Sequence, residues 1–161
     1  MPRRGLLDES RGASRVLPND CDINFHMNNG RYLTFMDLGR THLMAQSGVL
    51  KVIFRERWMP VLAAAEINFI RSIEPLQKFD LVTRLLSWDE KYFYIEQKFE
   101  AGGRLCAHAY VKGLFLKRGQ KLPNSAIAAA AGFHDAPPPL PEELRFWNEL
   151  GNAKKQRSEE K

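Results

Sequence analysis

Long apolar runs are missing from this chain of 161 residues. No window approaches the roughly 18 consecutive apolar residues that a membrane-spanning helix needs. Arg3 and Arg4 lie near the start, but no apolar stretch follows them, so we expect no secretory signal. Cysteine is scarce as well: Cys21 and Cys106 are too few for a disulfide framework. These absences predict one globular domain in a reducing, cytoplasmic setting.

The charge pattern lacks the signatures of nucleic-acid-binding proteins, although the formal net charge is +5. There is no basic stripe interleaved with aromatic residues and no zinc-finger spacing, so we expect no nucleic-acid partner. Basic residues gather instead at the two ends: Arg3, Arg4, Arg11 and Arg15 at one, and Lys154, Lys155, Arg157 and Lys161 at the other. Two interpretations stay open, namely flexible solvated termini or attraction to an anionic ligand that carries phosphates.

The chain has no internal repeat and one break in composition, the proline-rich stretch FHDAPPPLPEE. Proline clusters interrupt regular structure, so this stretch marks the end of the main body. It is followed by PEELRFWNEL, which is typical of a short amphipathic helix that starts at Pro141. We therefore predict four parts: a flexible basic N-terminus (1–15), the main domain (16–132), a proline-rich linker with a short helix (133–152) and a disordered tail (153–161).

Apolar residues at helical spacing predict a long helix from Gly30 to about Ser47. The spaced residues are Tyr32, Phe35, Met36, Gly39 and Leu43. Asn28 or Asn29 can cap the start of this helix, and Gly48 is a natural stop at its end. Further apolar residues on the other faces predict that the helix is buried on most sides.

The middle of the chain changes to a period of two, which predicts half-buried strands. Four segments alternate in this way, at 67–73, 79–85, 93–99 and 105–115. The connections between them are short, and short connections favour antiparallel neighbours. The predicted fold is therefore α+β, with one long helix wrapped by a curved antiparallel sheet. A sheet with an uncovered edge also predicts a dimer.

The loop before the helix, NDCDINFHMNNGRY, concentrates carboxylates, carboxamides and a histidine in one short segment. Asp20, Asp22 and Asn24 occupy the first three ligand positions of a calcium-binding EF-hand loop. Phe25 stands where that loop needs glycine, and Arg31 stands where it needs glutamate, so calcium is excluded. Asp22 and the single histidine of the loop would give a transition metal only two ligands, and we predict no metal site.

Two interpretations of the loop remain, a capping turn and an acid–base site. Asparagine and aspartate commonly fill turns and helix caps, which suffices for Asn28 and Asn29. The acid–base interpretation uses the whole loop, and we prefer it. Asp22 would activate water or attack directly, with Asn24 and His26 orienting it. Backbone N–H groups of residues 28–30, at the positive end of the helix dipole, would polarise a carbonyl oxygen.

The run DINFHMNNGRY, residues 22–32, resembles a motif of the hotdog-fold thioesterases: aspartate, three residues, then His-hydrophobic-Asn-Asn and a nearby tyrosine. This is the thioesterase-like superfamily related to 4-hydroxybenzoyl-CoA thioesterase. A second stretch, INFIRSIEPLQKFDLVTRLLSWDEKYFYIEQKF, is similar to the branch around vertebrate thioesterase superfamily member six. The resemblance implies a hotdog fold, homodimers or tetramers built from dimers, and sites between subunits for acyl-CoA or acyl-carrier thioesters.

The resemblance also implies roles for individual residues. The catalytic aspartate of the family falls on Asp22, and the plant acyl-carrier thioesterases, with their Asp-x-Asn-x-His spacing, would place a functional trio on Asp22, Asn24 and His26. Those enzymes have a glutamate on the next strand, which corresponds loosely to Glu66. Their neighbouring cysteine is replaced by Ile67, which argues against a cysteine mechanism. The expected substrate-binding residues are Asn28, Asn29, Gly30, Tyr32 and Glu66.

The expected function is hydrolysis of an acyl-CoA or acyl-carrier thioester, with Asp22 as general base or as nucleophile through an anhydride. Coenzyme A belongs to the substrate, and we expect no separate cofactor. Residues 49–62 would form part of an acyl pocket, or else ordinary core. A hotdog hydratase is disfavoured, because its Asp-x-Asn-Pro-x-His pattern is broken by Phe25 and by the early position of His26. A non-catalytic acyl-thioester-binding protein stays open as the alternative.

Overall fold

The fold was taken from a computed structural model that describes residues 5–159; residues 1–4 and 160–161, which belong to the predicted flexible ends, lie outside this range. The strands are β1 (Ser10–Arg15), β2 (Met59–Phe69), β3 (Lys78–Trp88), β4 (Phe93–Ala101), β5 (Arg104–Lys117) and β6 (Gln120–Leu122). The helices are the single 3-10 turn η1 (Pro18–Asp20), α1 (Asn29–Ser47), α2 (Val49–Glu56), α3 (Asn124–Ala130) and α4 (Glu142–Glu159).

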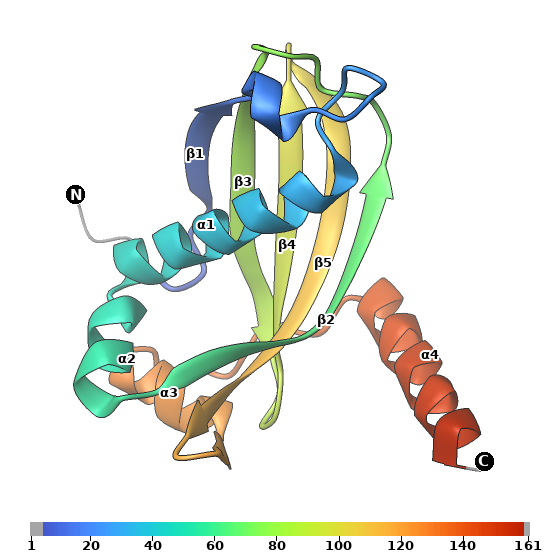
Figure 1. The fold of residues 1–161 in the computed structure, drawn as a ribbon. Helices are drawn as coiled ribbons and strands as arrows, with labels where there is room; N and C mark the ends of the chain where they lie inside the picture. The colour runs from blue at the N-terminus through green and yellow to red at the C-terminus, as the bar shows by residue number, and fades with distance from the viewer. Residues whose placement is uncertain (1–4, 160–161) are drawn as a thin grey trace.

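The strands form one antiparallel sheet in the order β1-β3-β4-β5-β2, and the short β6 pairs with the C-terminal end of β5. The sheet curls around α1, which crosses the strands on its concave side (Figure 1). The main core lies between them and includes Met36 of α1, Phe79 of β3, Phe99 of β4 and Val111 of β5. The predicted α+β class and the helix wrapped by a sheet are confirmed.

Helix α1 has the predicted ends but not the predicted burial. The Asn28 side chain accepts a hydrogen bond from Gly30 N at 2.8 Å, and Gly48 ends the helix in the left-handed conformation with φ 83°. Only one stripe of the helix is buried, formed by Tyr32, Met36, Leu43 and Ser47. Leu33 and Leu38 are 41% and 61% exposed, so the prediction of burial on most sides was wrong for a single chain.

A close contact near the middle of α1 fixes the helix on the sheet. A Cβ atom at Gly39 would lie 2.7 Å from Leu81 Cδ2, so only glycine allows this approach. Next to it, the fully buried Gln97 donates hydrogen bonds to Met36 O and to Thr83 Oγ1, each at 3.0 Å. A buried amide with both partners in place specifies one position of the helix.

Strand β1 replaces part of the predicted flexible N-terminus. It pairs with β3 over its whole length, and the Arg11 guanidinium lies 3.2 Å from an Asp80 oxygen and 2.8 Å from a Glu100 oxygen. Buried and exposed positions alternate along it, as in any half-buried strand. The inward positions are Ser10, Gly12 and Ser14, and these small residues give no apolar signal from which the strand could have been recognised.

Strand β2 begins earlier and ends earlier than predicted. It starts at Met59, after α2 has taken up the first half of the apolar segment 49–62, and it ends at Phe69. Beyond that point the N–H groups of Ile70 and Arg71 both donate to the carbonyl oxygen of Cys106, at 2.8 and 2.9 Å. Two donors on one carbonyl break the regular ladder, so the chain leaves the sheet although the sequence continues to alternate.

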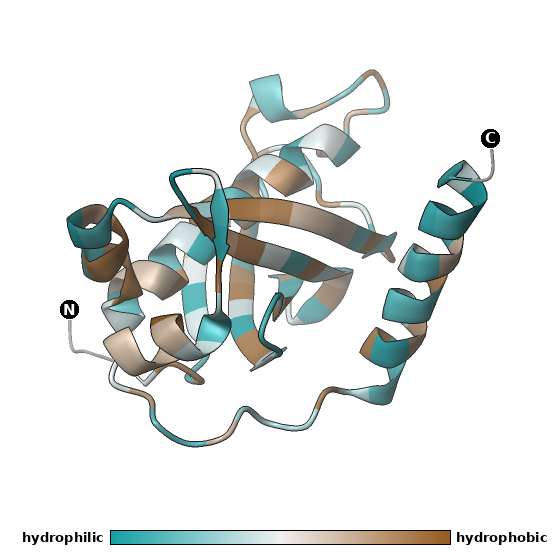
Figure 2. Cartoon of the chain, turned by 90° about the horizontal axis from the view of Figure 1, so that it is seen from below, coloured by the Kyte–Doolittle hydropathy of each residue, from teal (hydrophilic) through white to brown (hydrophobic). Residues whose placement is uncertain are grey.

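The last helix is longer than predicted. Pro141 directly precedes α4, as expected, but the helix runs to Glu159, across most of the segment predicted to be a disordered tail. Leu144 is fully buried, whereas Leu150 is 52% exposed. The hydropathy colouring shows that α4 carries mostly hydrophilic residues (Figure 2). No helix within residues 5–159 is long and apolar enough to span a membrane.

Candidate active site

The polar loop between η1 and α1 is a tight hairpin. The Asp22 N–H donates to His26 O at 3.0 Å, and the Phe25 N–H donates to Asp22 O at 3.1 Å. Phe25 takes a left-handed backbone conformation with φ 57°, which closes the turn. Its side chain is 75% exposed. Cys21 and Met27 form an isolated antiparallel bridge at its base. The hairpin therefore holds Asp22 and His26 opposite each other.

One oxygen of the Asp22 carboxylate is used within the loop. Its Oδ1 accepts a hydrogen bond from the Asn24 N–H at 2.9 Å, so Asn24 supports the carboxylate through its backbone. Its Oδ2 has no hydrogen-bond donor within residues 5–159. A half-buried carboxylate with one anchored and one free oxygen can accept a proton without losing its position.

Asp20 anchors the loop, a role that the sequence did not reveal. It is 2% exposed, and its Oδ1 accepts a hydrogen bond from Arg31 Nε at 2.7 Å and lies 2.7 Å from Arg31 Nη2 in an ion pair. Its Oδ2 accepts from the Leu17 N–H at 2.8 Å, and its carbonyl oxygen accepts from the Asn28 N–H at 2.8 Å. One residue thus ties η1, the end of the loop and the first turn of α1 together. The only signal in the sequence was an arginine in the first turn of the helix.

A cavity of about 290 Å³ opens beside the loop. Its lining comes from the loop, from the start of α1 and from the end of β2: Asp22, Asn24, His26, Met27, Asn29, Tyr32, Phe69, Ile70, Arg71 and Ser72. The structure therefore brings together five of the predicted site residues, Asp22, Asn24, His26, Asn29 and Tyr32. Arg71, whose guanidinium donates to Leu105 O at 2.8 Å, adds a positive charge to the lining.

The backbone donors at the start of α1 differ from the prediction. Of the three N–H groups expected to polarise a carbonyl oxygen, the Asn28 N–H donates to Asp20 O and the Gly30 N–H donates to Asn28 Oδ1, both at 2.8 Å. The Asn29 N–H has no acceptor among the residues that the structure describes. Helix capping by the Asn28 side chain removes the Gly30 donor, and a backbone hydrogen bond to Asp20 removes the Asn28 donor. Asn28 and Gly30 are therefore structural here, and Asn29 provides the free donor.

Burial governs the titration of two groups near the cavity. Loss of solvation raises the pKa of Tyr32 to about 12, so its phenol is neutral at physiological pH. Its ring is held edge-on between Phe69 and Phe99. The pKa of the Cys21 thiol is also raised, mainly by desolvation and to a smaller extent by the negative charges of Asp20 and Asp22. A thiol with a raised pKa is a poor nucleophile, which agrees with the absence of the cysteine pattern noted in the sequence.

His26 and Glu66 lie in different surroundings. The His26 Nε2 atom lies 3.5 Å from a carboxylate oxygen of Glu74 in the β2–β3 loop, at the rim of the cavity. Glu66 pairs in register with Tyr110, while its neighbour Ile67 packs into the core under α1. Successive strand residues point to opposite faces, so Glu66 faces away from α1 and from the cavity. Alternation sends the Glu66 side chain to the outer face, so it does not line this cavity in a single chain, and its role in substrate binding stays a prediction.

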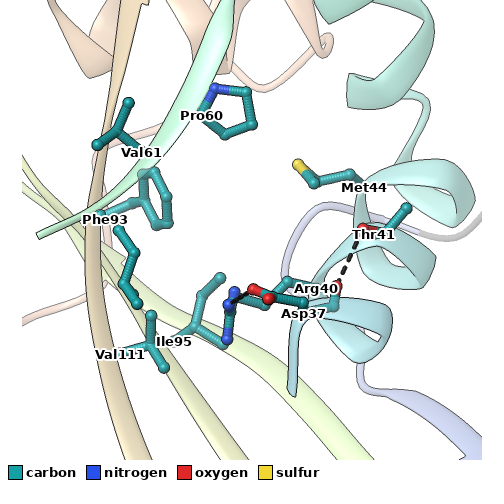
Figure 3. Close-up of a pocket in the computed structure, with 11 residues that line it drawn as sticks. Asp37, Arg40, Thr41, Met44, Pro60, Val61, Phe93, Ile95 and Val111 are labelled. Carbon is teal, nitrogen blue, oxygen red and sulfur yellow. Dashed lines mark hydrogen bonds and ion pairs between the residues drawn. The ribbon is translucent and has the colours of Figure 1, made fainter. Parts of the chain in front are cut away.

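A second space lies between α1 and the first part of β2, with a volume of about 240 Å³. Figure 3 shows Arg40 and Met44 on α1 facing Pro60 and Val61 on β2, with Phe93 behind them. Its lining is mostly apolar, and the Arg40 guanidinium is held by Asp37 and by Gln97 Oε1, the latter at 2.9 Å. We call this space the acyl chamber, after the acyl pocket expected from residues 49–62. It involves only the end of the segment 49–62, because α2 packs its buried residues in a separate apolar cluster.

Comparisons with known proteins assign the family. The model of the thioesterase-like superfamily matches residues 16–147. The chain is 31% identical over 156 residues to protein THEM6 of Xenopus laevis, covering 95% of this chain and 73% of that protein. It is 32% identical over 108 residues to a probable thioesterase of Saccharomyces cerevisiae, covering 65% of this chain and 46% of that protein. The crystal structure of the probable thioesterase YbaW from Escherichia coli superimposes with a TM-score of 0.68 at 19% identity, covering 74% of this chain and 93% of that one. This chain belongs to the thioesterase-like superfamily and has the hotdog fold.

Proposed function

We propose that this chain is a thioester hydrolase that acts on acyl-CoA or on an acyl-carrier thioester. The observation that carries the proposal is that two residues line one cavity: Asp22, whose half-buried carboxylate keeps one oxygen free, and Asn29 at the start of α1, whose N–H has no acceptor within residues 5–159. Relatives from yeast and other fungi bear the name thioesterase, which supports this class of reaction. Coenzyme A or the carrier group would be part of the substrate, with no separate cofactor.

The geometry supports hydrolysis by water. The substrate carbonyl oxygen would accept the Asn29 N–H at the positive end of the α1 dipole, where developing negative charge is stabilised. Asp22 Oδ2 would take a proton from water as the water oxygen bonds to the carbonyl carbon. When the C–S bond breaks, the proton on Asp22 passes to the departing sulfur. The products are a carboxylic acid and a thiol, and Asp22 is ionised again.

Two further possibilities remain predictions. Asp22 could attack the carbonyl carbon itself, giving an anhydride that water then cleaves. The protein could also bind an acyl thioester without turning it over, because a shared fold does not carry activity by itself. A cytoplasmic location likewise remains a prediction, based on the two free cysteines.

The exposed edge of β2 supports a homodimer. This strand ends the sheet, is eleven residues long and carries a single charged residue. Met59, Leu62 and Phe69 on it are each about half exposed. The opposite edge, β1, is shorter and is protected by Arg11 and Arg15. A long apolar edge attracts another strand, and a second copy of β2 is the symmetric partner for it.

Antiparallel pairing of two β2 strands would join the two spaces described above. The midpoint of Met59–Phe69 is residue 64, so full-length pairing sets Phe69 of one copy opposite Met59 of the other. Phe69 borders the Asp22 cavity, and Pro60 and Val61 border the acyl chamber. In one chain these spaces lie roughly 25 Å apart, because strands rise about 3.3 Å per residue. In the proposed dimer, the carboxylate of one chain would serve an acyl group held by its partner.

The test is thiol release from a panel of short, long and aromatic acyl-CoAs and from acyl-carrier protein. We expect at least one substrate to turn over, and Asp22→Asn to lower kcat by about 10²-fold or more, as loss of a positioned base predicts. Asp135→Asn, an exposed aspartate in the linker, is the matched control and should leave kcat unchanged. If no thioester is cleaved while binding persists, the non-catalytic alternative replaces the proposal.

A further inference from the structure

The acyl chamber has a second apolar lobe behind it. The chamber itself holds about 240 Å³, and the space behind it holds about 70 Å³. Met44, Phe93 and Ile95 line both, so they form the partition between the two lobes. Beyond the partition, the back lobe reaches Trp88 on β3 and Ile127 on α3.

Phe93 is the aromatic part of this partition. It is half-buried, and its ring lies directly over Gly113, its register partner on β5. A Cβ atom at Gly113 would come within 2.3 Å of the Phe93 ring, so glycine provides the space in which the ring lies. On its other side the ring packs against Phe115, with centroids 5.0 Å apart. The ring therefore has one well-defined position, between the two lobes.

The back lobe offers an aliphatic ligand contacts but no hydrogen bonds. Its lining is almost entirely apolar, and its two polar side chains are already satisfied. Ser47 Oγ donates to Leu43 O at 3.0 Å, and Asn124 Nδ2 donates to Asp89 O at 2.8 Å. A polar or charged group placed there would lose its hydration without replacement, whereas methylene groups would gain from burial.

We propose that the two-lobed chamber binds the aliphatic chain of the acyl substrate and that Phe93 limits the length of the chain. This inference rests on the proposed function and adds the substrate class to it: straight-chain acyl groups whose end stops against the Phe93 ring. The chain would enter between β2 and α1, past Val61, and extend toward Met44 and Phe93. A longer chain would have to displace the ring from Gly113.

The length limit has a measurable form. Each methylene group that a chain buries improves its affinity by roughly fourfold, from about 0.8 kcal/mol per group. Affinity should therefore rise with chain length until the front lobe is filled and then level off. Removing the Phe93 ring joins the lobes, so in the variant the rise should continue over further methylene groups.

The experiment measures binding and turnover separately. Binding of straight-chain fatty acids from butanoate to palmitate is measured by titration calorimetry with wild type, Phe93→Leu and Phe93→Ala. Hydrolysis of the matching acyl-CoAs is followed by thiol release. Phe35→Ala is the control, because Phe35 is also half-buried but lines a separate cavity between α1 and β1. Thermal unfolding identifies any variant that fails to fold, and Phe93→Leu remains as the milder change.

We expect the preferred chain length to increase from wild type to Phe93→Leu to Phe93→Ala, with roughly fourfold gains in affinity for each added methylene, and no change in Phe35→Ala. A folded Phe93→Ala with the wild-type chain-length profile overturns the inference. Fatty acids that bind with this profile while no acyl-CoA is cleaved would instead overturn the proposed function and leave the chamber assignment standing.

Discussion

Replacing Asp20 with alanine tests whether this residue anchors the candidate catalytic loop. The substitution removes the acceptor of one hydrogen bond from Arg31 Nε and of one from the Leu17 N–H, together with the ion pair to Arg31 Nη2. It also leaves a guanidinium without its carboxylate. The Asp20 side chain is 2% exposed, but that of Arg31 is 40% exposed, so water can partly replace the lost partner.

The size of the effect follows from this exposure. Breaking a fully buried ion pair costs about 3–5 kcal/mol, and a hydrogen bond to a charged group is worth about 1.5–3 kcal/mol. Because water reaches Arg31, we expect Asp20→Ala to lower the free energy of unfolding by about 2 kcal/mol. For a chain of this size, that loss should lower Tm by roughly 4–8 °C. The loosened loop should also lower kcat more than it raises KM.

Urea unfolding followed by tryptophan fluorescence measures the loss as a shift of the midpoint at constant slope. Asp135→Ala, at an exposed position, is the control and should stay within about 0.5 kcal/mol of wild type. A double-mutant cycle with Arg31→Ala should show a coupling of about 1 kcal/mol or more. An Asp20→Ala protein as stable as the control, or a coupling near zero, would refute the anchoring role.

Three further predictions concern the rest of the fold. Gly39→Ala should destabilise the protein by about 1–3 kcal/mol because its Cβ would meet the sheet at 2.7 Å, whereas Gly12→Ala, with nothing within 4 Å, should be neutral or stabilising on urea unfolding. Leu62→Glu, on the β2 edge, should convert the proposed dimer to monomers in sedimentation, whereas Leu150→Glu, at a similarly exposed position, should not. A hydrogen bond from Lys91 lowers the pKa of Tyr92, so Tyr92 should be the first tyrosine to ionise as the pH rises. Tyr92→Phe should therefore remove the step at lowest pH when tyrosinate absorbance is followed against pH.

The sequence predicted the elements whose signals are local. Periodicity and caps predicted α1 to within one residue of each end, because Asn28 and Gly48 act on the backbone beside them. Strand β1 was missed, because a strand of serines, glycine and arginines is stabilised by its pairing with β3 and not by its own apolar pattern. The burial of α1 was overestimated, since apolar residues such as Leu38 do not reveal whether another chain covers them.

The candidate site was predictable in part for the same reason. Asp22, Asn24 and His26 are neighbours in the sequence, and the hairpin keeps them together. The role of Asp20 depends on a buried contact with Arg31, eleven residues away, which composition does not reveal. The displacement of Glu66 from the cavity depends on strand register, and a shift of one residue changes the face.

The most direct measurement is complementation between two inactive variants, Asp22→Asn and Val61→Trp, which fills the acyl chamber. Each homodimer should be nearly inactive in thiol release. If Asp22 of one chain serves the chamber of its partner, a mixed dimer has one intact site, and random mixing should restore about a quarter of the wild-type rate. No recovery in a sample shown to contain mixed dimers, or full activity of the Asp22→Asn homodimer, would contradict a shared Asp22 site.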